Sequence, residues 1–194
     1  MAQEKSAVPY HQIRALYDDD SITVYQAYNA KIADEAVKQQ TLKVPGWSSE
    51  RMTWIKPSWS WMMNQSRVLA IRMSHSSFET ILLKSSLSNS SQEKQPVRVQ
   101  WDPERTPSTK NKLPYRSIQI GIGRSVAETW AQDMILSIED VTEKAQKMHE
   151  DVEAGMSEDE LAEKYIEERV YEIKDEELRK IIRLDSLEDH ETES

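Results

Sequence analysis

The segment RMTWIKPSWSWMM places Lys56 among three tryptophans and begins with Arg51. An ammonium group beside indole rings can pack on a ring face, hold a phosphate, or become a nucleophile when apolar surroundings lower its pKa. Tryptophan and methionine at helical spacing usually belong to a hydrophobic core, so a core role is the main interpretation for Trp61 and Met62. Lys56 and Trp54 are the stronger candidates for chemistry.

Two further runs alternate polar with apolar residues. The run VRVQW carries Arg98 and Gln100, and the run YRSIQIGI carries Arg116 and Gln119. Alternation with a period of two predicts strands with one apolar and one polar face. Arginine and glutamine on neighbouring strands can bind a phosphate or a nucleobase edge, whereas an ordinary solvated sheet face is the equally weighted alternative.

Charged residues follow the first of these runs. Asp102 and Pro103 should end the strand, and Glu104 and Arg105 come next. Arg105 either contacts an anionic ligand or simply pairs with one of the two carboxylates, an arrangement that contributes little at a surface. These residues extend the candidate binding site beyond the strand.

Gln26 lies in the strand-forming run SITVYQAY, aligned with apolar residues and preceded by Tyr25. A glutamine on an apolar face is either an exception at a sheet edge or a ligand contact. Arg14 lies a short distance upstream and joins the candidates for anion binding.

Several kinds of site are excluded or disfavoured. The chain has no cysteine, which excludes disulfides and thiolate chemistry, and its four histidines have no metal-ligand spacing, so we predict no metal site. It contains no GxGxxG, P-loop or HExxH motif. No signal peptide or membrane-spanning stretch is recognisable, and we expect a cytoplasmic protein, with the nucleus as an alternative.

Charge is distributed unevenly along the chain. Residues 1–130 carry 17 Lys and Arg against 12 Asp and Glu, and residues 131–194 carry 8 against 22. A basic body can attract an anionic ligand despite the net charge of −9, although the two parts could instead simply neutralise each other. The acidic C-terminal part is the candidate surface for a protein partner.

The remaining patterns predict an α+β fold with a small mixed or antiparallel sheet, packed helices and an acidic helical C-terminal tail. Strands are expected at 21–28, 68–73, 97–101 and 115–122, and helices at 32–40, in a short turn after Ser58, at 78–87 after a Ser76 or Ser77 cap, from Ser125 through Val141, at 158–169 and at 175–184. The expected organisation is a domain at 1–145, an acidic helical extension at 146–184 and a disordered tail at 185–194.

Three stretches together resemble the domain-of-unknown-function family DUF4291. They are the runs from Ile13 to Tyr28, from Arg51 to Ser58, and from Val97 to Arg105 with Tyr115 to Gly121, and the resemblance covers roughly residues 10–145. The family name implies no activity. The family pattern carries an extra basic, glycine-containing loop before the strand at Arg67, where this chain has only Asn64-Gln65-Ser66. If that loop closes over a ligand, this chain is a weakened or inactive member.

Two enzyme analogies follow from the strand and helix around Gln26. The arrangement is similar to the start of ADP-ribosyltransferase-like domains, in which Gln26 would grip NAD and Gln100, Gln119 or Glu104 would hold the ribose. An RNA-ligase-like nucleotidyltransferase would use a lysine followed by acidic and glycine residues, which the sequence after Lys56 lacks. NAD or ATP is therefore the candidate cofactor.

These observations lead to one main hypothesis and one alternative. The main hypothesis is a nucleotide- or nucleic-acid-binding transferase-like domain, and the alternative is a non-catalytic binding or protein-interaction module. Gln26, Lys56 and Glu104 are the catalytic candidates. The ligand-binding candidates are Arg14, Tyr25, Arg51, Trp54, Arg98, Gln100, Asp102, Arg105, Arg116 and Gln119.

Overall fold

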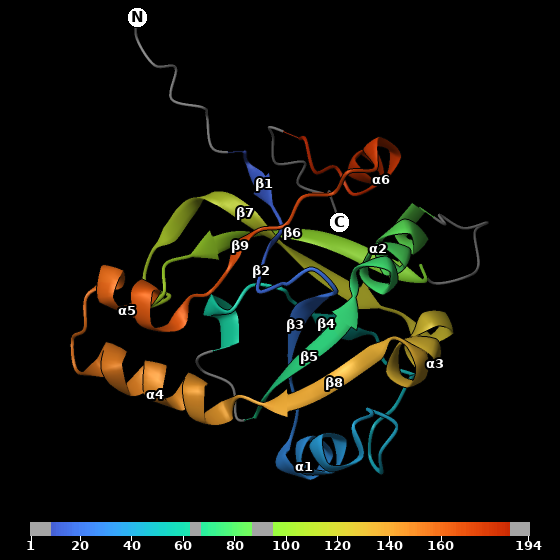
Figure 1. The fold of residues 1–194 in the computed structure, drawn as a ribbon, viewed down its shortest axis with the longest axis horizontal. Helices are drawn as coiled ribbons and strands as arrows, with labels where there is room; N and C mark the ends of the chain where they lie inside the picture. Colours follow the sequence, from blue (N-terminus) through green and yellow to red (C-terminus); the bar gives the residue numbers. More distant parts are fainter. Residues whose placement is uncertain (1–8, 63–66, 87–94, 187–194) are drawn as a thin grey trace, which may run out of the picture.

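The computed structural model describes residues 9–62, 67–86 and 95–186 of the chain (Figure 1). The described residues form helices and strands in the irregular order expected of an α+β protein. The helices are α1 Ala30–Gln39, α2 His75–Leu83, α3 Arg124–Asp133, α4 Thr142–Glu153, α5 Glu158–Tyr165 and α6 Glu176–Ile181, with 3-10 turns η1 Ser60–Met62 and η2 Lys84–Ser86. The strands are β1 His11–Gln12, β2 Arg14–Ala15, β3 Ser21–Ala27, β4 Thr53–Ile55, β5 Val68–Ser74, β6 Val97–Arg105, β7 Lys112–Ile122, β8 Ile135–Asp140 and β9 Arg169–Val170.

Two small sheets organise the chain. In the first, β7 pairs antiparallel with β6 and β4 and parallel with β1, and in the second, β5 lies antiparallel between β3 and β8. A short antiparallel β2–β9 pair lies beside them. One isolated bridge between Tyr25 and Lys56 joins the end of β3 to the residue after β4. The predicted α+β class with a small mixed or antiparallel sheet is confirmed.

The second sheet separates two hydrophobic cores. Ile22 and Val24 of β3 face the larger core, which also contains Ile118 and Ile120 of β7 and side chains of α1, α2, α3 and α6. On the opposite face of the second sheet, Val68 and its neighbours pack with η1, α4 and α5 in the smaller core. These elements lie to the left of β5 and β8 in Figure 1. The helices of the acidic part therefore contribute to both cores.

Local signals explain the start and end of α1. The side chain of Asn29, the expected cap, accepts a hydrogen bond from Ile32 N, which satisfies one free amide of the first turn. Gln40 follows the last turn with φ of 55°, and its amide donates to Ile138 O and accepts from Ile138 N, at 2.8 Å each. Gln40 thus occupies hydrogen-bonding groups of β8 that an edge strand would otherwise expose.

The helix predicted from Ser125 through Val141 is wrong in its second half. Helix α3 ends at Asp133, and β8 pairs with β5 from Leu69↔Asp140 to Met73↔Ile135. The isoleucines of β8 fit either a helical or an extended pattern, and pairing with β5 decides between them because it satisfies the backbone groups of both strands.

Two expected boundaries also differ. Strand β6 continues through Pro103 to Arg105, because among the described residues β6 pairs only with β7, and a proline is tolerated where its missing N–H is not needed. Helix α2 is capped by Ser74, whose Oγ accepts from Ser77 N, rather than by Ser76 or Ser77.

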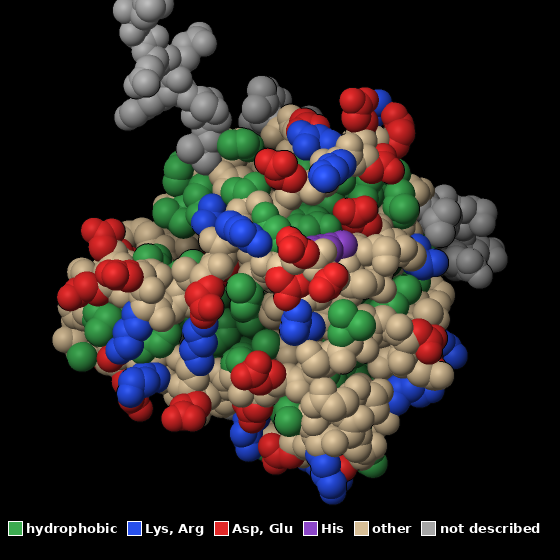
Figure 2. Space-filling model, viewed as in Figure 1, with side chains coloured by type: hydrophobic (Ala, Val, Ile, Leu, Met, Phe, Trp, Pro, Cys, Tyr) green, Lys and Arg blue, Asp and Glu red, His purple; other side chains and the backbone are tan. Residues whose placement is uncertain are grey.

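The acidic C-terminal part contains α4, α5 and α6. Helices α5 and α6 lie within the ranges predicted at 158–169 and 175–184 but are shorter, because Arg169 belongs to β9, and α4 was not predicted as a separate helix. Leu178, Ile182 and Leu184 pack in the larger core with the residues of β6 and β7. Figure 2 shows basic and acidic side chains intermixed over the viewed face. The predicted domain boundaries stay predictions, and most of the tail, residues 187–194, lies outside the described residues.

Candidate functional site

A groove with a volume of about 610 Å³ runs along β4, where the end of β3 meets the first sheet. Its walls come from the end of β3, the start of α1, the segment before β4, η1 and β7. The sequence-predicted residues that line it are Tyr25, Gln26, Arg51, Trp54, Lys56 and Gln119. Five aromatic side chains, Tyr25, Tyr28, Trp47, Trp54 and Trp61, also line this groove.

The strand register places several predicted residues on one face of the first sheet. Trp54 of β4 and Arg98 of β6 both pair with Gly121 of β7, and Gln100 pairs with Gln119. Paired residues project from the same face of a sheet. This face is the one opposite the isoleucines of β7, and it carries the predicted polar side chains of β6.

Gly121 allows Trp54 to lie close against this face. A Cβ atom at Gly121 would lie 3.0 Å from two carbons of the Trp54 indole and 2.6 Å from Met52 Sδ. Any larger residue would therefore displace the indole. Gly121 serves packing here, because it allows the close approach of a side chain to the sheet backbone.

Lys56 is buried, with 4% of its surface exposed. Its Nζ lies 3.2 Å from Asp102 Oδ2 and 5.3 Å from the centroid of the Trp61 ring. Burial lowers the pKa of Lys56, and the negative charges of Asp102 and Glu104 oppose that shift. Lys56 is thus a desolvated cation beside a groove, with one direct carboxylate partner.

Gln26 is also buried, with 7% of its surface exposed. Its Nε2 donates to Thr53 Oγ1, while its Oε1 has no hydrogen-bond partner in the described structure. Tyr28 Oη lies 3.5 Å from the same threonine oxygen and accepts a hydrogen bond of 3.2 Å from Trp47 Nε1. Buried polar atoms are almost always paired, so the amide oxygen of Gln26 requires an explanation.

Two further carboxyl groups, those of Glu104 and Glu168, lie near enough to Lys56 for their charges to affect its pKa. Glu104 is 3% exposed, and its Oε1 accepts from Arg105 N at 2.9 Å, whereas its Oε2 has no partner among the described residues. Glu168 accepts a hydrogen bond from Trp59 N. Burial raises the pKa of Glu168 to about 8, and the charge of Glu104 acts in the same direction.

Sequence reasoning missed Glu168. Glu168 follows α5 within a run of acidic residues, and the sequence pattern gives no sign that Glu168 differs from its solvated neighbours. Only the packing of the segment between α5 and β9 brings it to Trp59, 109 positions earlier in the chain.

The predicted arginines divide into three groups. Arg51 and Arg98 are exposed, Arg51 in the groove and Arg98 on the adjoining sheet face. Arg105 lies 5.4 Å from the centroid of the Trp61 ring, on which Lys56 also packs, and donates to Thr109 O at 3.1 Å. The structure therefore brings Arg105 to the surroundings of Lys56.

Arg14 and Arg116 have structural partners. Arg14 lies 5.7 Å from the centroid of the Tyr115 ring and donates to Glu168 O at 3.4 Å. Arg116 projects from the same side of β7 as its isoleucines, and donates to Tyr10 Oη at 2.9 Å and to Trp101 O at 3.0 Å. Arg116 therefore does not reach the groove.

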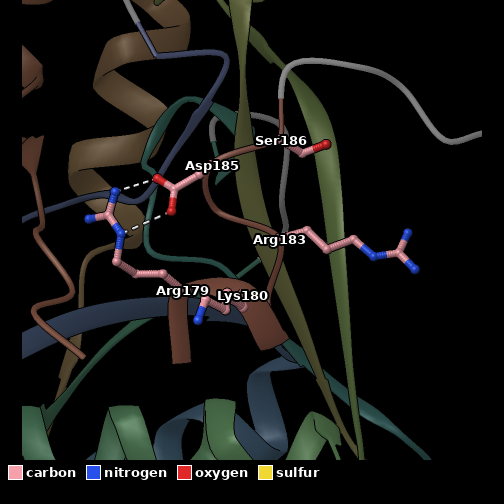
Figure 3. Close-up of a pocket in the computed structure, with 5 residues that line it drawn as sticks. All are labelled: Arg179, Lys180, Arg183, Asp185 and Ser186. Carbon is pink, nitrogen blue, oxygen red and sulfur yellow. Dashed lines mark hydrogen bonds and ion pairs between the residues drawn. The ribbon is translucent and has the colours of Figure 1, made fainter. Parts of the chain in front are cut away.

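A second hollow, of about 670 Å³, lies beside the end of α6, and two of the three cations that line it are paired (Figure 3). Arg179 forms a bidentate pair with Asp185, and Lys180 pairs with Glu177 at 2.7 Å. Arg183 extends away from that pair in Figure 3. No predicted site residue lines this hollow.

The described residues contain no group of three or more His, Asp and Glu side chains that could hold a metal ion. Within the same residues, no helix has the length and apolar composition needed to cross a membrane.

Residues 12–171 match the family described as domain of unknown function DUF4291. The chain belongs to the DUF4291 family. The match in this DUF4291 domain extends through α4, α5 and β9, and therefore includes Glu168. A comparison with curated proteins finds no significant match. The segment Asn64-Gln65-Ser66, at which we predicted a shorter loop than in the family pattern, lies outside the described residues.

Proposed function

We propose that this DUF4291 domain binds a nucleotide in the β4 groove and acts on it as a transferase-like domain. The observation that carries the proposal is the unpartnered amide oxygen of Gln26, buried at a groove that also holds the buried ammonium of Lys56. A ligand with an N–H donor would satisfy the first group, and a phosphate would satisfy the second. Nucleotides carry both.

The walls of the groove suit a planar ring. Trp54 supplies an apolar ring on which a nucleobase or nicotinamide stacks favourably, whereas the Trp61 ring already packs with Lys56 and Arg105. The carboxamide of nicotinamide and the amino group of adenine are N–H donors of the kind that Gln26 Oε1 lacks. Arg51, exposed at the same groove, adds a second cation for a phosphate.

The catalytic part of the proposal concerns Lys56 and Glu104. In the ADP-ribosyltransferase-like interpretation the ligand is NAD, and Glu104, which is buried and does not itself line the groove, would accept a hydrogen bond from a ribose hydroxyl through its unpartnered oxygen only if a local movement exposed it. In the RNA-ligase-like interpretation the ligand is ATP, and Lys56 attacks the α-phosphate with release of pyrophosphate. The lowered pKa of Lys56 favours the second reaction, whereas its pairing with Asp102 opposes it.

Thermal unfolding with NAD or ATP tests binding. A ligand at 100 times its dissociation constant adds about 2.7 kcal/mol to the free energy of unfolding. For a chain of this size that corresponds to roughly 5–10 °C in Tm. We expect Gln26→Met to abolish the shift and Gln39→Met, at an exposed glutamine of α1, to retain it. If neither nucleotide shifts Tm, the proposed function is wrong.

The two reactions are separated by mass spectrometry of the intact protein. Incubation with ATP leaves an adenylate on Lys56 only in the RNA-ligase-like reaction, and Lys56→Arg removes it. Incubation with NAD releases nicotinamide only in the other reaction. We also propose a cytoplasmic location and a protein partner that binds the acidic helices. Neither of these is tested by the binding and mass measurements.

A further inference from the structure

The groove opens onto an exposed face of β6 and β7. Trp54, Gly121 and Arg98 form one row across β4, β7 and β6, and Gln119 and Gln100 form part of the next. Arg98 and Gln100 are exposed, and Trp54 and Gln119 are partly exposed. We call these four side chains, together with Arg51, the sheet-face surface.

The two arginines of this surface are uncommitted. Neither Arg51 nor Arg98 forms an ion pair or a side-chain hydrogen bond within the described part of the chain, whereas Arg67, Arg72 and Arg124 all pair with carboxylates. Two exposed guanidinium groups, Arg51 in the groove that Trp54 lines and Arg98 across Gly121 from Trp54, give this surface a local positive charge. That charge complements an anion with a planar ring.

We propose that the sheet-face surface binds a short single-stranded nucleic acid. One base stacks on Trp54, and the neighbouring phosphates contact Arg51 and Arg98. Exposed aromatic rings combined with cations are the usual means of holding single strands, because unpaired bases offer a stacking face that a duplex hides. The amides of Gln100 and Gln119 lie where they can bond to base edges.

The spacing of the sheet fits this arrangement. Neighbouring strands lie about 4.8 Å apart, so the Arg98 backbone is roughly 10 Å from that of Trp54, across Gly121. The side chain of Arg98 is long enough to reach a phosphate next to a base that is stacked on Trp54. The inference builds on the proposed nucleotide groove, since Trp54 also lines that groove, and it extends the ligand from one nucleotide to a strand.

Fluorescence anisotropy with labelled eight-nucleotide RNA and DNA single strands tests the proposal. For single strands the slope of log K against log salt is about −0.7 for each phosphate contacted, so two contacts give roughly −1.4. We expect Arg51→Gln and Arg98→Gln each to weaken binding about tenfold and to reduce the slope by about 0.7.

Two further variants separate stacking from charge. Trp54→Ala should weaken binding roughly tenfold with the salt slope unchanged. Gly121→Ala should act in the same direction, because the added Cβ displaces the indole while both arginines remain. The RNA and DNA arms establish whether the 2′-hydroxyl contributes.

Arg183→Gln is the matched control, since Arg183 is also exposed and forms no ion pair in the described structure, but lies beside α6. Equal losses for Arg183→Gln and Arg98→Gln, or equal binding of a duplex, would overturn the proposal. Arg98→Gln should leave the Tm shift with NAD or ATP intact. If single-stranded nucleic acid does not bind but NAD or ATP still shifts Tm, this inference is wrong and the proposed function stands. If single-stranded nucleic acid binds but neither nucleotide shifts Tm, the proposed nucleotide site in the groove is wrong.

Discussion

Replacing Gln26 with methionine should stabilise the protein and remove its ligand binding together. An unpartnered buried polar atom costs about 1–3 kcal/mol, and a typical hydrogen bond, such as that from Gln26 Nε2 to Thr53, contributes about 1 kcal/mol. Methionine has nearly the same length and no amide, so it fills the site while removing both contributions. We expect the free energy of unfolding to rise by about 1 kcal/mol.

Urea unfolding and scanning calorimetry measure this change. For a chain of this size, 1 kcal/mol corresponds to about 2–4 °C in Tm. Gln39→Met, at an exposed position, should stay within about 0.5 kcal/mol of the original protein. If Gln26→Met lowers stability by 1 kcal/mol or more, or keeps the Tm shift with nucleotide, then Gln26 is a structural residue and the reasoning fails.

Three other changes test the surroundings of the groove and the fold. Burial raises the pKa of Glu168 to about 8, so the folded protein favours the protonated carboxyl. The free energy of unfolding should therefore fall as pH rises from about 5 to 8, by up to about 1.4 kcal/mol per pH unit. Glu168→Gln should flatten that dependence in urea titrations across pH, and an unchanged slope would contradict it. Asp102→Asn should cost about 3 kcal/mol, because Lys56 loses its carboxylate, while Glu50→Gln, in an exposed pair, should change the urea midpoint little. Gly123→Ala should lower Tm by an amount equivalent to about 1–3 kcal/mol, since its Cβ would lie 2.9 Å from two backbone oxygens, and an unaffected Tm would show that this turn can relax.

Local signals predicted the elements that depend on neighbouring residues. The β-branched run before Asn29 forms β3, and Asn29 caps α1, because both features need only a few adjacent side chains. The alternation in β6 and β7 also predicted the polar face that carries Arg98, Gln100 and Gln119. The strand β8 was missed because its isoleucines suit two periods, and the choice depends on β5.

The sequence by itself determined the family resemblance, the α+β class and the residue types of the candidate site. Tertiary structure decided which of them meet. Lys56 and Asp102 lie 46 positions apart and form an ion pair. Glu168 reaches Trp59 from the segment after α5, and Arg116 projects away from the groove. The physical reason is that periodicity records only which face a side chain occupies along its own element. Which faces then come together depends on strand register and on the packing of segments far apart in the chain.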